Sequence, residues 1–292
     1  MADRPEAAPW VWSQHWNDVL FLHWPVSATT LRSQIPASLE IDTYEGVAWV
    51  SLVLFRLRVR RRWLPFLPGL SNLIEANVRT YVRYCDQPGI RFLSVYADNA
   101  WAIRLARKLT PMPYLRAEMG YRCCGEESEF TVRRPPSLRF ALSLAFRTRP
   151  GHKAATAGTL DAWLLERYRL YIADRGQRLL QADVVHAPWE IQHADVAISA
   201  NSIGEQVGLE LRGGPAKVHF SRGVQAKFGV FQTMNGWHAL SLRRAWVPRT
   251  PFEDSGHATR RRSGVDVIFP HADAAEESVG VVAEPDAGGE MP

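Results

Sequence analysis

The chain has 292 residues, of which 46% are hydrophobic and 22% are charged, a composition that excludes collagen-like, mucin-like and wholly disordered proteins. Its formal net charge of +5 would suit a nucleic-acid partner, but only four of the 35 basic residues are lysines. Any chemistry that needs an amine must therefore use Lys108, Lys153, Lys217 or Lys227.

The cysteine count and the apolar runs bear on the compartment. Three cysteines, of which Cys123 and Cys124 are adjacent, are too few for a disulfide framework. Residues 1–9 lack the apolar core of a signal peptide, and no window approaches the roughly 18 consecutive apolar residues of a membrane helix. We expect a cytoplasmic protein without a membrane partner. The sequence leaves a homo-oligomer open.

The first 72 residues predict two elements and a packed N-terminal segment. Four tryptophans in residues 1–26 indicate a segment packed onto the domain rather than a free tail. A short helix is expected from Ser27 to Ile35, where Ser27 can cap it and Pro36 stops it. Residues 47–59 predict a long strand, buried first and half-exposed at its end, and Pro65, Pro68 and Gly69 mark a loop.

The next strand, residues 73–84, has two different faces. Its period of two places Glu75, Asn77, Arg79 and Tyr81 on one side and apolar or small residues on the other. Such a face lies in bulk water in most sheets. Here the flanking residues and the neighbouring strand are apolar, so the row could instead line a cavity, with Arg79 binding a carboxylate. Both interpretations stay open at this point.

The later segments predict more strands than helices. A turn at 87–89 leads into a strand at 90–96, and a helix at 99–109 has Asn99 near its N-cap. Apolar residues at helical spacing predict an amphipathic helix at 159–173. The remaining segments predict strands at 116–123, 128–133, 138–147, 179–186, 194–199, 216–220 and 224–232. This order is not a βαβ alternation, and it predicts an α+β protein with a mainly antiparallel sheet and few helices.

The composition changes near the C-terminus. Residues 270–292 carry six acidic residues and no lysine or arginine. We therefore expect one domain at 1–235 and a C-terminal extension at 236–292 that is disordered from about residue 250.

The usual motifs of catalysis and metal binding are missing. The chain has no G-x-x-x-x-G-K-[ST], G-x-G-x-x-G, H-E-x-x-H or G-x-S-x-G pattern, and Cys123-Cys124 lacks the C-x-x-C spacing of zinc sites. His186 and His219 could meet in space, but strand histidines are more often structural. We expect no metal and no cofactor.

A basic run from Arg56 to Arg62 holds five arginines in seven positions. One interpretation is a nucleic-acid patch. The other is a solvated strand end whose charge discourages edge pairing, and we favour it. A nucleic-acid partner is accordingly not expected, and an arginine-mediated binder centred on Arg60, Arg61 and Arg62 is the weakest alternative.

Several short motifs resemble the YqjF-like family of uncharacterised proteins, also called domain of unknown function 2071. The similarity runs from about residue 10 to 232. The motifs are Leu22-His23-Trp24-Pro25, Ile35-Pro36 with Leu39-Glu40-Ile41-Asp42, Ala48-Trp49-Val50, Glu75 to Val82, Ala106-Arg107 with Pro113-Tyr114 and Ala117, Glu166-Arg167-Tyr168, and His186-Ala187-Pro188-Trp189.

The same region is more distantly similar to acetoacetate decarboxylase. That resemblance implies an antiparallel sheet curled into a cone or barrel around an internal pocket, with the row of Glu75 facing inward. Glu75 falls where that family has a catalytic glutamate. The family's Schiff-base lysine follows a proline, but here Tyr114 and Leu115 follow Pro113, and neither forms an imine.

The resemblance and the polar row together give a site hypothesis. The pocket would bind a small carboxylate- or carbonyl-bearing molecule, with Asn77, Arg79 and Tyr81 binding it. If the protein is an enzyme, Glu75 would be the general acid or base and Tyr114 a hydrogen-bond donor. The alternative is a binding or sensory module that kept the pocket and lost the nucleophile.

Overall fold

The structure is a computed structural model that describes residues 10–61, 72–124, 126–134, 141–174 and 176–234. The predicted loop at 65–69 and the predicted extension at 236–292 lie outside these residues. All of these described residues belong to one compact unit, Met1–Ala245.

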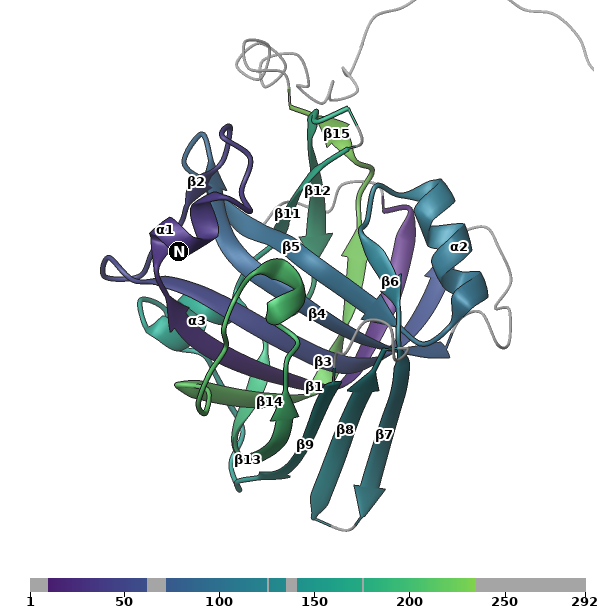
Figure 1. The fold of residues 1–292 in the computed structure, drawn as a ribbon, viewed down its shortest axis with the longest axis vertical. Coiled ribbons are helices and arrows are strands. Elements are labelled where there is room, and N and C mark those ends of the chain that lie inside the picture. Colours follow the sequence, from purple (N-terminus) through teal and green to yellow (C-terminus); the bar gives the residue numbers. More distant parts are fainter. Residues whose placement is uncertain (1–9, 62–71, 125, 135–140, 175, 235–292) are drawn as a thin grey trace, which may run out of the picture. The chain divides into compact units, whose positions relative to one another are not determined.

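Strands dominate the described residues, as predicted, and few helices accompany them (Figure 1). The helices are α1 (Ala28–Arg32), α2 (Ala100–Leu109), α3 (Leu160–Leu165) and a 3-10 turn at Glu205–Val207. The strands are β1 (Trp12–Val26), β2 (Glu40–Ile41), β3 (Ala48–Arg61), β4 (Asn72–Tyr84), β5 (Gln87–Ala97), β6 (Tyr114–Arg116), β7 (Glu118–Cys124), β8 (Glu127–Arg133), β9 (Ala141–Thr148), β10 (Lys153–Ala154), β11 (Arg169–Ala173), β12 (Leu179–Val185), β13 (Glu190–Asn201), β14 (Lys217–Phe228) and β15 (Gln232–Thr233). The predicted α+β class is confirmed.

The central sheet of the described region curls back on itself. Its hydrogen-bonded order is β12-β11-β5-β4-β3-β1-β14, and an additional pairing of β12 with β14 closes this series into a ring. The pairings are antiparallel except that β11 and β6 run parallel to β5. On the other side of β14, β13, β9, β8 and β7 continue the sheet, and the last three lie side by side in Figure 1.

Strands β1, β3 and β4 are buried on both faces. One face contributes Leu20, Leu52 and Val78 to a cluster shared with the β7–β9 strands. The other face contributes Phe21 and Val53 to a cluster inside the ring. Burial on both faces explains why β3 begins as a nearly continuous apolar run rather than as a clean alternation, whereas β4 carries its polar row on one of its two buried faces.

Three local predictions were wrong. The hairpin between β4 and β5 turns at Cys85 and Asp86, whose φ angles of 46° and 61° form a two-residue turn, so the strand already includes Pro88 and Gly89. Only the first part of the predicted helix at 159–173 is helical. The last part, Arg169–Ala173, is β11. The prediction failed there because a short run buried on every side has no periodicity that separates helix from strand.

The third correction concerns β14. The sequence predicted strands at 216–220 and 224–232, but Lys217–Phe228 is one strand. Gly223 makes this continuity feasible, since a Cβ there would lie 1.9 Å from the carbonyl oxygen of Trp16 on β1. The tryptophan-rich N-terminal segment is the central strand β1, which the sequence did not predict as a strand.

Helix α2 packs beside β6, and α3 contacts β4 through the bonds of Tyr81 and Arg79 to the Leu164 carbonyl. Asn99 caps α2 by accepting from the backbone N–H groups of Trp101 and Ala102, as the sequence predicted. Thr159 caps α3 by accepting from the N–H of Ala162. No helix in the described part of the chain is long and apolar enough to cross a membrane.

Candidate functional site

The polar row of β4 lies on the face that points into the ring. Glu75, Asn77, Arg79 and Tyr81 are all buried, with side chains of adjacent strands packed around them. Because alternate residues of a strand share a face, the four side chains follow one another along the interior.

Glu75 and Tyr114 meet inside the ring. The Tyr114 hydroxyl donates to Oε2 of Glu75 at 3.0 Å, and Nδ2 of Asn77 lies 3.4 Å from Oε1. The pairing of β6 with β5 brings Tyr114 to this position, and Arg107 of α2 fixes the backbone there by donating from Nε to the Tyr114 carbonyl at 2.8 Å.

Burial changes the acidity of this pair. It raises the pKa of Glu75 from 4.5 to about 7, although the bonds from Tyr114 and Asn77 act in the opposite direction. Burial and the adjacent Glu75 carboxylate raise the pKa of Tyr114 well above its usual value of 10. A carboxyl group that titrates near neutral pH can both take up and give back a proton.

A cavity of about 190 Å³ adjoins the pair. Glu75, Asn77, Arg79 and Tyr114 line it, and most other lining residues are apolar. The aromatic part of the wall consists of Trp12, Trp16, Phe21, Phe55, Phe92, Trp189, Phe228 and Phe231. A buried carboxyl group at the edge of a mostly apolar cavity is an arrangement typical of ligand sites.

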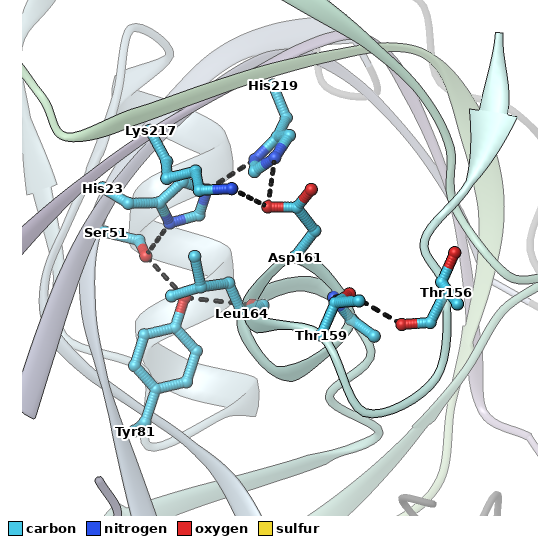
Figure 2. Close-up of polar contacts among 10 residues, drawn as sticks. His23, Ser51, Tyr81, Thr156, Thr159, Asp161, Leu164, Lys217 and His219 are labelled. Atoms are coloured by element: carbon cyan, nitrogen blue, oxygen red, sulfur yellow. Dashed lines mark hydrogen bonds and ion pairs between the residues drawn. The ribbon is translucent and has the colours of Figure 1, made fainter. Parts of the chain in front are cut away.

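Tyr81 occupies a different place from the other three residues of the row. It is outside the set of described residues that line the cavity. Its hydroxyl lies 2.6 Å from Ser51 Oγ and donates to the carbonyl of Leu164 in α3 at 3.0 Å (Figure 2). Tyr81 thus fastens α3 to the strands, next to the Arg79 Nη2 that lies 3.5 Å from the same carbonyl.

A buried polar chain, which the sequence did not predict, continues from Ser51 (Figure 2). Ser51 Oγ lies 2.6 Å from Nδ1 of His23, whose Nε2 lies 3.2 Å from Nδ1 of His219. Nε2 of His219 is 3.1 Å from Asp161, and Lys217 Nζ donates to the same carboxylate oxygen at 2.7 Å. This series of polar contacts joins β3, β1 and β14 to α3.

Burial and hydrogen bonding together set the electrostatics of these polar residues. Burial lowers the pKa of His23 well below 6.5, and the nearby His219, Arg79 and Lys217 act in the same direction. The contacts with His219 and Lys217 hold the pKa of Asp161 well below its usual range. His23 is therefore a neutral interior group near neutral pH.

The histidines that the sequence considered for a metal lie apart. His186 packs among Trp16, Tyr168 and Trp189, whereas His219 contacts His23 and His193. Within the described ranges no group of three metal-ligating side chains could hold an ion.

The arginines of the basic run that can be described are exposed on the last part of β3. Arg56 pairs with Asp18, and Arg58 donates to Asn72 at 3.2 Å. Arg62 lies outside the described residues. The interpretation as a solvated strand end and that as a nucleic-acid patch both stay predictions.

Solved structures of similar fold share this architecture. The acetoacetate decarboxylase of Legionella pneumophila subsp. pneumophila str. Philadelphia 1 matches with a TM-score of 0.56 at 12% identity, over 82% of this chain and 94% of that chain. The enduracididine biosynthesis enzyme MppR in complex with pyruvate matches with a TM-score of 0.55 at 12% identity, over 78% and 91%. At this identity the likeness shows the fold, which is that of acetoacetate decarboxylase.

Closer similarity comes from sequences. The model of the DUF2071 family, described as an uncharacterised conserved protein, matches residues 13–225. The uncharacterised protein YqjF of Bacillus subtilis (strain 168) is 39% identical over 214 residues, which cover 73% of this chain and 88% of that protein. The chain belongs to the DUF2071 family.

Proposed function

We propose that the cavity binds a small carboxylate- or carbonyl-bearing molecule and that Glu75 is a general acid–base group there. The observation that carries the proposal is the buried Glu75 carboxyl, with a pKa of about 7, hydrogen-bonded to Tyr114 at the cavity wall. General acids and bases work best when their pKa lies near the operating pH.

The reaction class that fits this pair is proton transfer at a carbon next to a carbonyl group. The Glu75 carboxylate takes the proton, the electron pair of the C–H bond forms a C=C bond, and the π pair of the carbonyl group moves to its oxygen to give an enolate. Once protonated, Glu75 needs the Tyr114 hydrogen bond less, so that the hydroxyl can donate to the enolate oxygen. Returning the proton completes the cycle.

The scheme uses no lysine imine. Tyr114 stands after Pro113, where the decarboxylase resemblance would place the reactive lysine, and none of the described residues that line the cavity is a lysine. Arg79, which also lines the cavity, supplies a positive charge for a ligand carboxylate. The similar structure of MppR was determined with pyruvate, which carries both a carboxylate and a ketone.

Solvent exchange tests the proposal. The full chain is incubated in D₂O with pyruvate or 2-oxohexanoate, and loss of the protons next to the ketone is followed by ¹H NMR. We expect exchange above the buffer rate, reduced about a hundredfold or more by Glu75→Gln. Glu127→Gln, at an exposed position of β8, is the matched control and should leave the rate unchanged. Equal rates for the wild type and Glu75→Gln would refute the acid–base role.

A binding or sensory module is the second candidate. Tyr114 favours it, because this residue stands where the decarboxylase resemblance would place the nucleophilic lysine, while the cavity is still present. The same 2-oxo acids would then raise the melting temperature without any exchange. We place either form in the cytoplasm, since Cys85, Cys123 and Cys124 are exposed and form no disulfide in the described part of the chain, as suits a reducing compartment.

A further inference from the structure

Two buried guanidinium groups line the same cavity as Glu75. Arg79 of β4 is 8% exposed and Arg167, just after α3, is 6% exposed. Nε of Arg79 and Nη2 of Arg167 are buried nitrogens without a hydrogen-bond partner among the described residues. A buried N–H left without an acceptor costs free energy, and an acceptor bound in the cavity that both residues line would remove that cost.

Arg167 is held firmly by its other nitrogens. Its Nε donates to the Trp163 carbonyl at 2.6 Å and its Nη1 to Oδ2 of Asp42 at 2.7 Å. The guanidinium carbon lies 4.2 Å from the centre of the Trp163 ring and 5.1 Å from that of Tyr81. These contacts fix its orientation, while the Nη2 group has no acceptor among the described residues.

Arg79 has no carboxylate within ion-pair distance among the described residues. Its guanidinium lies 5.5 Å from the Phe21 ring, and its Nη2 is 3.5 Å from the Leu164 carbonyl. The Tyr81 hydroxyl already donates to that carbonyl at 3.0 Å (Figure 2). Arg79 can therefore turn toward a ligand without leaving Leu164 unsatisfied.

The charges around the two groups do not balance. Asp42 is the acidic partner of Arg167, and it also pairs with Arg83 at 3.0 Å. Burial lowers the pKa of Arg167, and the positive charge of Arg79 acts in the same direction. The two guanidinium groups are therefore close enough to interact electrostatically. An unpaired buried charge is costly, and an anionic ligand would remove that cost.

We propose that Arg79 and Arg167 form a two-arginine subsite for the carboxylate of a hydrophobic monocarboxylic acid. This inference deepens the proposed function, on which it rests for the cavity being a ligand site. The N–H groups without an acceptor, at Nε of Arg79 and Nη2 of Arg167, could each donate to one oxygen of a carboxylate. A phosphate is a poorer match, because the mainly apolar wall offers few donors to its further oxygens.

The rest of the cavity defines the body of the acid. Trp16 and Trp189 stack with their ring centres 5.9 Å apart, and Phe55 and Phe228 contact Trp16. A flat aromatic or medium-length aliphatic group packs well against such a wall. The ligand thus has its carboxylate at the arginines and its apolar part along the aromatic side chains.

Calorimetry with a matched pair of probes tests the subsite. 3-Phenylpropanoate and its neutral isostere 3-phenylpropanamide are titrated into the full chain at pH 7. We expect the acid to bind at least tenfold more tightly than the amide, because charge-assisted hydrogen bonds are stronger than neutral ones. Equal affinities, or binding of neither probe, would overturn the subsite even if every variant failed to fold.

Variants then identify the residues. Arg79→Met and Arg167→Lys should each weaken binding of the acid about tenfold or more and leave the amide unaffected. Arg83→Met is the control, because it also removes a partner of Asp42 but does not line the cavity. Unchanged binding of the acid by folded Arg79→Met and Arg167→Lys would contradict the assignment.

Glu75→Gln separates this inference from the proposed function. It should reduce exchange about a hundredfold or more while retaining or improving the binding of 3-phenylpropanoate, since a carboxylate is removed from the cavity. Arginine-dependent binding without exchange in any variant would refute the acid–base role alone. Exchange that depends on Glu75, together with equal binding of acid and amide, would refute the subsite alone.

Discussion

Glu75 carries an energetic cost that depends on pH. Its pKa is about 7 in the folded protein and about 4.5 in a solvated chain, because burial disfavours the carboxylate. Between these values the folded state holds a proton that the unfolded chain has lost. The contribution of Glu75 to stability is therefore fully present below about pH 4.5 and is lost as the pH rises through 7.

Glu75→Gln should remove this pH dependence. We expect it to raise the free energy of unfolding by about 3 kcal/mol at pH 8, since the pKa rises from 4.5 to about 7 and each pKa unit corresponds to about 1.4 kcal/mol, and to raise it by less than about 1 kcal/mol at pH 5. Urea denaturation at the two pH values measures the difference. An equal effect at both pH values would show that the carboxyl titrates normally.

His23 acts in the opposite direction. The folded protein holds it neutral, with a pKa well below 6.5, whereas the unfolded chain takes up a proton near that value. The stability that follows is present above about pH 6.5 and is lost as the pH falls, because the unfolded state then binds more protons.

Replacement of His23 should therefore flatten the acid side of the stability curve. For His23→Gln we expect the free energy of unfolding to fall less between pH 7 and pH 5 than in the wild type. His152→Gln, at an exposed position, is the control and should keep the wild-type slope. The test is urea denaturation over that range, and identical slopes for wild type and His23→Gln would argue against a neutral buried imidazole.

At the scale of elements, the predictability of the site depends on how far apart its residues lie in sequence. The Glu75 row was predictable, because residues two apart on one strand share a face. His23 and His219, 196 positions apart, meet only because β1 pairs with β14, and no local pattern contains that pairing. Arg167 was missed because the sequence predicted one helix over 159–173, whereas the residue lies between the end of α3 and the start of β11.

The motifs of the family did contain some of this information. His23 lies in Leu22-His23-Trp24-Pro25 and Arg167 in Glu166-Arg167-Tyr168, both of which carry the resemblance. A motif marks a residue but does not say which way its side chain points. For His23 that direction depends on the part of β1 that is buried on both faces, where apolar periodicity is uninformative.

Close contact between β14 and β1 gives a prediction about the ring. Gly223 has a φ of 136°, and a Cβ there would lie 1.9 Å from the Trp16 carbonyl oxygen. We expect Gly223→Ala to destabilise the protein by about 3 kcal/mol or more, the size typical of backbone strain combined with overpacking. Gly214→Ala, where nothing lies within 4 Å, is the control. Similar melting temperatures of the two variants would contradict this account of the contact.

At the scale of the whole molecule, a fold shared with acetoacetate decarboxylase surrounds a cavity whose lining combines aromatic side chains with a few polar groups. The ring of strands encloses an aromatic cavity, and the groups beside it are a carboxyl, a phenol and two guanidinium groups. We propose that these groups bind an acid and move a proton, and none of the described residues that line the cavity is a lysine. The sequence predicted this fold class and named Glu75 and Tyr114 as site residues, whereas the position of Arg167 beside the cavity is seen only in the structure.

The pH profile of solvent exchange tests the central claim most directly. The rate of deuterium incorporation into 2-oxohexanoate is measured between pH 5 and pH 9 for the wild type and Glu75→Gln, with Glu127→Gln as the control. We predict that the wild-type and control rates rise with pH and level off above about 7, as the Glu75 carboxylate forms, and that Glu75→Gln shows no such rise. Absence of exchange in the wild type, or a profile that Glu75→Gln leaves unchanged, would contradict the account.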